Sequence, residues 1–143
     1  MLRPFKILLV LLSCLFAASA QESQPSKPAT PDSTAIPADA VNQVNPVKPT
    51  PESIAQGKKY YGYDCVMCHG NNGDGKGEVA IDEKLKLGDL SDPATLKGKT
   101  DGELFYIIKN GHDHMPPEGE RLKSPELWNL VNYIRSLATK KTQ

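Results

Sequence analysis

The residues best suited to chemistry are two cysteines and a histidine in the run Cys65-Val66-Met67-Cys68-His69. Cysteines three positions apart on a helical turn lie on one face, so both thiols can form thioether bonds with one edge of a flat macrocycle. The histidine follows at once, and its ring can swing beneath that macrocycle to ligate iron. Cys-x-x-Cys-His is the attachment sequence for c-type haem. We therefore interpret the run as the site of one covalent haem c.

Three other interpretations of this run are weaker. A redox dithiol is usually a bare Cys-x-x-Cys in a strand-helix context, and no strand pattern precedes this one. A structural zinc site needs about four ligands. The remaining histidines are His112 and His114, so a Cys₂His₂ zinc site is conceivable. A disulfide between Cys65 and Cys68 is the third alternative.

The second axial ligand must come from elsewhere, and Met115 is the best candidate. It precedes Pro116-Pro117 in a polar loop between two predicted helices, where a methionine is poorly placed as a core filler. Thioether ligation favours reduced iron and raises the redox potential. His112 and His114 compete as ligands, but we expect both to face solvent near the haem edge. We thus predict His69 and Met115 as axial ligands and no catalytic residue.

The elements around these residues are predicted to be helical. Capping signals and apolar periodicity predict helices over about 51–61, 101–110 and 124–138. The glycine-rich stretch 70–98 reads as mostly loop, and no stretch has a convincing strand pattern. We expect a small all-α domain with a thin core, which a covalent haem would stabilise.

Taken together, residues 52–138 resemble a class I cytochrome c, because family-type elements stand in the expected order. They are Gly57 and Tyr61, Cys65 to His69, the glycines 70, 73, 75 and 77, Asp101 to Phe105, Asn110-Gly111, Met115 to Pro117, Trp128, and Tyr133 to Leu137.

The resemblance implies a cytochrome c fold of three or more short helices around one covalent haem. It also implies single-electron transfer rather than enzymatic catalysis, with a dehydrogenase, an oxidase or another cytochrome as redox partner. In this family the first and last helices cross closely, and Gly57 would let Tyr133 approach. One departure concerns the proline whose carbonyl commonly holds the ligating histidine, because no proline lies between Gly70 and Asp92. We expect another carbonyl, within residues 85–90, to hold His69.

The N-terminal part predicts export. Residues 1–20 combine a short basic start, an apolar run too short to span a bilayer comfortably, and Ala18-Ser19-Ala20, which a signal peptidase would cut. Lipidation at Cys14 and an uncleaved signal acting as a membrane tether are the alternatives. We predict a signal peptide over 1–20, a Pro-rich disordered linker over 21–50 that is dispensable for folding, a cytochrome c domain over 51–139 and a tail over 140–143. The location would be periplasmic or otherwise extracytoplasmic.

Charge and composition narrow the function further. The chain carries 17 cationic and 17 anionic side chains, so nothing points to nucleic acid as a partner. Our leading hypothesis is an exported electron carrier. A haem-bearing subunit of a dehydrogenase or oxidase complex is the first alternative, and a five-coordinate haem enzyme or sensor is the second.

Overall fold

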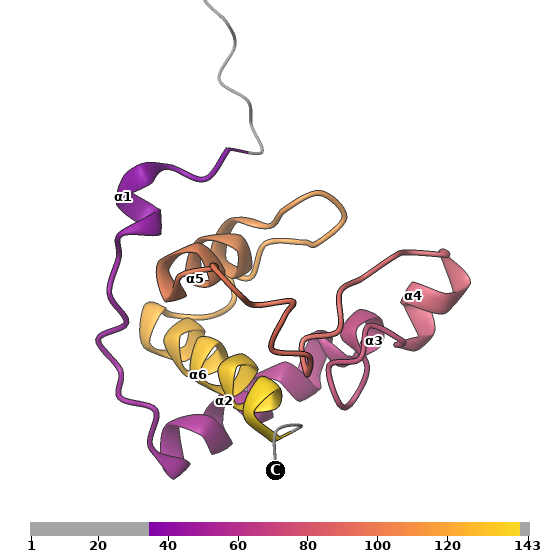
Figure 1. Cartoon of the computed structure of the whole chain (residues 1–143), viewed down its shortest axis with the longest axis horizontal. Coiled ribbons are helices and arrows are strands. Elements are labelled where there is room, and N and C mark those ends of the chain that lie inside the picture. Colours follow the sequence, from indigo (N-terminus) through magenta and orange to yellow (C-terminus); the bar gives the residue numbers. More distant parts are fainter. Residues whose placement is uncertain (1–34, 141–143) are drawn as a thin grey trace, which may run out of the picture. The chain divides into compact units, whose positions relative to one another are not determined.

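The computed structural model describes residues 35–140, with side chains to residue 138. Over this range the chain is all-α, and its one β-type feature is an isolated bridge between His112 and Met115. None of the helices described is long and apolar enough to cross a membrane. The helices, shown in Figure 1, are α1 (Ala38–Val41), α2 (Pro51–Asp64), α3 (Val66–His69), α4 (Glu78–Asp82), α5 (Asp101–Asn110) and α6 (Ser124–Lys140).

The three longer helices begin where the capping signals predict. Thr50 accepts a hydrogen bond from the Ser53 amide at 3.2 Å, and Pro51 occupies the first position of α2. At α5 the capping box is complete, because the Thr100 hydroxyl caps the Glu103 amide and the Glu103 carboxylate caps the Thr100 amide at 2.6 Å. The differences lie at two helix ends: α2 continues to Asp64, almost a turn beyond its predicted end, and α6 continues to Lys140 rather than residue 138.

The core forms where α2 crosses α6 and α5 packs beside α6 (Figure 1). A Cβ at Gly57 would collide with the Asn129 carbonyl and lie 2.7 Å from Tyr133 Cβ, so only glycine allows the two helices to come this close. Tyr61 and Tyr133 then meet edge to face, with ring centroids 5.1 Å apart. The close approach expected of Gly57 and Tyr133 is confirmed. The apolar stripe of α6 is buried throughout, at Leu127, Leu130, Val131, Ile134, Leu137 and Ala138.

The glycine-rich stretch is not entirely loop, because it contains the short helix α4, which packs against α3. Gly77 immediately precedes α4, and a Cβ there would collide with the carbonyl groups of Val66 and Met67. The missing side chain therefore lets this segment pass directly over the backbone of α3.

Residues 35–50, which were predicted to be part of a disordered linker, instead pack along the helices. Asn45 donates a hydrogen bond to Asn132 Oδ1 at 2.9 Å, and Asn132 donates to the Val47 carbonyl at 3.0 Å. Val47 contacts the hydrophobic core, and α1 lies against α5. The physical reason is that the segment has few apolar residues, but Asn45 and the Val47 carbonyl satisfy the polar side chain of Asn132, which is only 4% exposed.

The predictions for both ends of the chain lie outside the described residues. This applies to the signal peptide over 1–20, to Cys14, to residues 21–34 of the linker and to residues 141–143 of the tail.

The helix crossing generates a first prediction. Gly57→Ala is expected to lower the free energy of unfolding by about 2 kcal/mol or more, because the methyl group meets backbone that cannot move aside easily. Gly62→Ala is the matched control: Gly62 lies in the same helix with nothing within 4 Å of an added Cβ, so alanine should be neutral or stabilise by up to about 1 kcal/mol. Thermal unfolding of both variants measures the difference, and equal midpoints would contradict the argument.

The packed segment generates a second prediction. Deleting residues 21–49 is expected to lower the free energy of unfolding by about 1–3 kcal/mol, because buried Asn132 loses two of its partners. Deleting residues 21–34 alone should leave the thermal midpoint unchanged, since their composition favours a linker. If both deletions gave the same midpoint as the full mature chain, residues 35–50 would contribute nothing to folding.

Candidate haem site

The predicted attachment residues lie together on one tight turn between α2 and α3. Cys65 lies between the two helices as the C-cap of α2 and the N-cap of α3, and its carbonyl accepts hydrogen bonds from the amides of Cys68 at 3.3 Å and His69 at 2.8 Å. Both cysteines are free thiols and half-buried. The structure thus presents two thiols and an imidazole on a single turn that directly follows α2.

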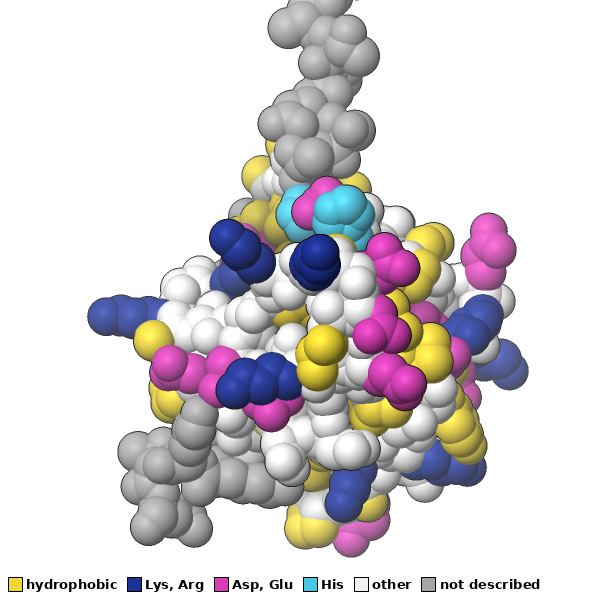
Figure 2. Space-filling view, turned by 90° about the vertical axis from the view of Figure 1, so that its right-hand side faces the viewer, with side chains coloured by type: hydrophobic (Ala, Val, Ile, Leu, Met, Phe, Trp, Pro, Cys, Tyr) yellow, Lys and Arg dark blue, Asp and Glu magenta, His cyan; other side chains and the backbone are white. Residues whose placement is uncertain are grey.

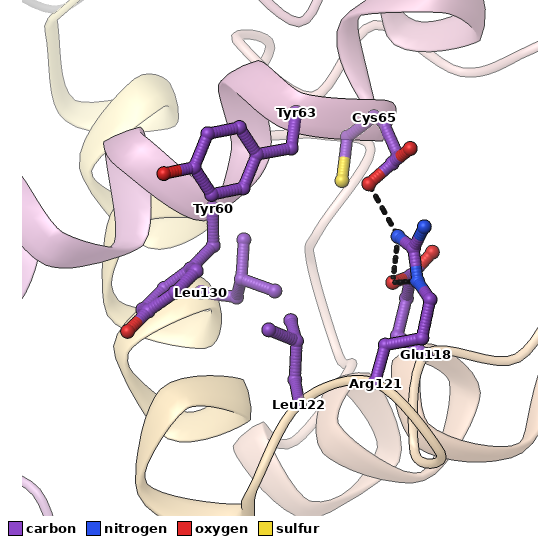
Figure 3. A pocket seen from close by; sticks show the side chains of 8 residues that line it. Tyr60, Tyr63, Cys65, Glu118, Arg121, Leu122 and Leu130 are labelled. Atoms are coloured by element: carbon purple, nitrogen blue, oxygen red, sulfur yellow. Dashed lines mark hydrogen bonds and ion pairs between the residues drawn. The ribbon is translucent and has the colours of Figure 1, made fainter.

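The Cys65 sulfur points into a cavity between the end of α2, the start of α6 and the loop before α6 (Figure 3). Tyr60, Leu122 and Leu130 form apolar walls, while Glu118 and Arg121 lie at one side (Figure 3). Asp64, which pairs with Arg121, also lines the cavity. Burial raises the pKa of the Cys65 thiol to about 12, and the nearby carboxylates of Glu118 and Asp64 add to this effect. The free thiol is therefore protonated at neutral pH and does not behave as a reactive thiolate.

His69 is held as a neutral imidazole. Burial lowers its pKa, because the charged form would lose its hydration. Its Nδ1 atom is buried and has no hydrogen-bond partner among the described residues. The carbonyl partner expected within residues 85–90 is therefore not found.

These features fit a haem. Neutral imidazole is the form that ligates a metal, no hydrogen bond to the buried Nδ1 of His69 ties its ring to another described residue, and the two thiols lie on the same turn, with Cys65 lining a cavity that has apolar walls. A tetrahedral zinc site is not assembled, because the described part of the chain has no group of three or more histidine, cysteine, aspartate or glutamate side chains placed to hold a metal ion.

Tyr61 fixes the far end of the attachment turn, a role that the sequence did not reveal. Its hydroxyl donates a buried hydrogen bond to the Gly70 carbonyl at 2.8 Å, and burial raises the pKa of the phenol. Gly70 directly follows His69 and has a positive φ of 75°. A buried tyrosine generally needs an acceptor, which was the available signal, but sequence alone could not say which carbonyl supplies it.

Met115 lies on a strap, residues 111–119, that joins the end of α5 to the loop before α6. Its amide donates to the His112 carbonyl at 2.8 Å, and the His112 amide donates back to the Met115 carbonyl at 3.0 Å, so the strap forms a tight turn around Asp113, whose φ is 52°. Met115 is half-buried against the hydrophobic core that Cys65 also contacts.

His112 and His114, by contrast, are exposed, as expected. Histidine side chains appear at the surface in Figure 2, where acidic and basic side chains are interspersed on the same face. His114 Nε2 lies 3.7 Å from the Asp113 carboxylate, and both side chains are more than 70% exposed. Of the three candidate second ligands, Met115 is the one that the fold turns towards the core.

The strap is anchored at both ends. At its start, a Cβ at Gly111 would lie 2.7 Å from the Met115 carbonyl, and Gly111 has a φ of 78° that favours glycine. At its end, the amides of Glu118 and Gly119 donate to the last carbonyls of α5, at Ile108 and Lys109, both at 2.9 Å. These bonds satisfy groups that a helix end leaves unpaired and hold the strap against α5.

Comparisons with known proteins agree with this geometry. Residues 52–134 match the family described as cytochrome C oxidase, cbb3-type, subunit III. The chain is 32% identical over 85 residues to cytochrome c6 of Cladophora glomerata, covering 58% of this chain and 87% of the relative. It is also 32% identical over 84 residues to the cbb3-type cytochrome c oxidase subunit FixP of Bradyrhizobium sp. (strain ORS 278), covering 58% of this chain but only 27% of that subunit.

Two solved structures share the fold. One is the reducing HAO-like protein complex Kustc0457/Kustc0458 of Kuenenia stuttgartiensis, at 28% identity and a TM-score of 0.57, over 64% of this chain and 46% of that one. The other is the KustC0563 c-type cytochrome, at 27% identity and a TM-score of 0.51, over 57% of this chain and 95% of that one.

The class that the fold and these relatives define is the c-type cytochromes, small helical proteins that carry covalent haem c. Within it, the chain belongs to the class I cytochrome c family whose domain is described as cytochrome C oxidase, cbb3-type, subunit III. The recognition made from the sequence and the all-α fold class are both confirmed.

Proposed function

We propose that this chain is an exported monohaem cytochrome that transfers single electrons between redox proteins and is not itself an enzyme. The haem would be bound through Cys65 and Cys68, with His69 and Met115 as axial ligands. The observation that carries the proposal is the single turn that presents two free thiols and a half-buried imidazole of lowered pKa, with the first of the two cysteines lining a cavity.

When bound, the haem supplies one-electron oxidation and reduction of iron. The chain's own residues hold the group and control its surroundings. The thiols of Cys65 and Cys68 would anchor it, the half-buried His69 has a lowered pKa and would bind the iron as a neutral imidazole, and the strap carries the thioether of Met115 as the proposed second ligand. Two protein ligands would fill both axial positions and leave no site for a substrate, which favours a carrier over a five-coordinate enzyme or sensor.

A second candidate is a haem-bearing subunit of a larger oxidase or dehydrogenase complex. The match to a cbb3-type oxidase subunit and the structural likeness to a chain of a multiprotein complex both favour it. Purification of the mature protein from native membranes separates the two: a free carrier elutes alone, whereas a subunit co-elutes with a larger haem protein.

Export is the remaining part of the proposal, because covalent haem attachment of this type belongs outside the cytoplasm. Removing residues 1–20 leaves 15 cationic and 17 anionic side chains, a net charge of −2 before the haem is counted. Redox encounters between such proteins bury little surface and are weak, so a mixed-charge surface like that in Figure 2 suits brief contact with a partner.

The ligand assignment gives a third prediction. Met115→Ala is expected to lower the redox potential and to leave iron that is high-spin or captured by His112 or His114, because thioether ligation favours reduced iron. A variant with both His112→Ala and His114→Ala should keep the wild-type spectrum, since both side chains are exposed. Absorption spectra and potentiometry decide the matter. Loss of low-spin character in the histidine variant but not in Met115→Ala would instead indicate a bis-histidine cytochrome.

Export and attachment give a fourth prediction, which intact mass measures. The mature protein should have the mass of residues 21–143 plus one haem. A species that retains residues 1–20, or that begins at an acylated Cys14, would contradict the periplasmic location. A mass without haem in a low-spin preparation would contradict covalent attachment.

A further inference from the structure

Three charged side chains link the strap to the attachment turn. Arg121 donates to Glu118 Oε2 from Nε at 3.2 Å and from Nη2 at 2.6 Å, and the same guanidinium pairs with Asp64 (Figure 3). Asp64 is the last residue of α2 and directly precedes Cys65, while Glu118 lies three residues after Met115. We call Asp64, Glu118 and Arg121 the charge clamp.

Glu118 is the unusual member of the clamp, because it is only 6% exposed. A buried carboxylate is strongly unfavourable unless it is paired and hydrogen-bonded. Its partner Arg121 lies within hydrogen-bond distance, and the Glu118 amide is bonded to α5, so the residue cannot easily turn its side chain to water. Removing Arg121 would therefore leave the Glu118 carboxylate without its charged partner, and movement of the strap towards water would relieve this.

Arg121 is suited to this task because its planar guanidinium can bind two carboxylates at once, which a lysine does less well. The two carboxylates come from segments 54 positions apart in the sequence, one at the attachment turn and one on the strap. The strap's prolines cannot contribute amide hydrogen bonds of their own, so the segment between Met115 and Glu118 is held by its ends.

We propose that the charge clamp is a positioning device that holds the strap closed against the attachment turn and so keeps Met115 on the haem iron. This inference rests on the proposed function, because it requires Met115 to be the second axial ligand. None of the three residues belongs to the proposed ligand set, so they would act through the strap. Their loss should weaken Met115 ligation much more than it weakens the fold.

All three clamp residues line the cavity into which the Cys65 sulfur points, together with Tyr63. The clamp thus borders the same cavity as the first cysteine of the attachment turn.

The test is a titration of the haem-loaded ferric protein with imidazole, which must displace Met115 to bind. Opening of the strap limits its apparent affinity, so a change in the open fraction appears directly in the dissociation constant. Arg121→Gln is expected to bind imidazole at least about tenfold more tightly than wild type, as the loss of a buried charge partner would produce. It should also show a weaker charge-transfer band of thioether sulfur on ferric iron and a lower redox potential.

Arg135→Gln is the matched control. Arg135 pairs with Asp101 at 2.8 Å and donates to the Lys99 carbonyl, so it also links segments that are distant in the sequence, but its hydrogen-bond partners belong neither to the strap nor to the attachment turn. Its removal is expected to lower thermal stability while leaving imidazole affinity within about twofold of wild type. If both arginine variants changed imidazole affinity equally, or if neither did, the clamp would have no positioning role.

A further variant covers the case in which Arg121→Gln does not mature. Asp64→Asn leaves the Glu118–Arg121 pair intact and removes only the charge at the attachment turn, so imidazole affinity should rise by a smaller factor, and unchanged affinity would overturn the proposal. Failure of the proposed function looks different: wild type itself would then lack the thioether charge-transfer band, and Met115→Ala would leave the spectrum unchanged.

Discussion

The crossing of α2 and α6 at Gly57 is the contact on which the rest of the structure depends. Backbone meets backbone there, because a Cβ on Gly57 would collide with the Asn129 carbonyl. The crossing fixes the direction of both helices, and each leads directly to one part of the site. The end of α2 continues into the attachment turn, and the start of α6 is preceded by the strap. A rigid crossing thus places two segments that are distant in the sequence relative to each other.

Hydrogen bonds between buried polar side chains supplement the small apolar core. Asn132, buried in α6, donates to Ser53 at 2.8 Å and to the Val47 carbonyl, and Ser53 in turn donates to Asn129 at 2.7 Å. These bonds join the N-terminal segment, α2 and α6 in one network. Because a buried polar group is unfavourable unless it is paired, such a network stabilises one arrangement of the helices over slightly shifted ones. Hydrophobic contact alone is less selective.

Much of the fold could be predicted because its signals are local. Thr50 and Thr100 cap helices through hydrogen bonds to residues three positions later, and the Cys65–His69 motif lies within five consecutive residues. Gly57 was identified through a family resemblance. Helix α4 was missed because the glycines on either side of a five-residue segment hide a weak helical pattern. The packing of residues 35–50 was missed because it depends on polar partners almost 90 positions away, such as Asn45 with Asn132.

The residues of the candidate site likewise include some that could be predicted from the sequence and some that could not. Its chemistry-bearing residues could be read from the sequence, since Cys65, Cys68, His69 and Met115 stand in recognisable runs. The residues that support them could not, because Tyr61 acts on a carbonyl and Arg121 reaches Asp64 across 57 positions. Side-chain type alone says that a tyrosine or an arginine needs a partner, but only the fold says which partner lies within reach.

The attachment turn and the strap differ in how firmly the fold holds them. The attachment turn is built into the end of α2 and supported by the Tyr61–Gly70 bond, so it cannot move without disturbing the helix crossing. The strap is different: it is held by bonds at its ends to α5, by the half-buried Met115 and by the charge clamp. The proposed opening of the strap would therefore be separable from unfolding. On the proposed ligand set, substitutions in the strap can change the redox potential while the helical core remains intact, because the fixed ligand and the adjustable ligand are carried by structural units of different stability.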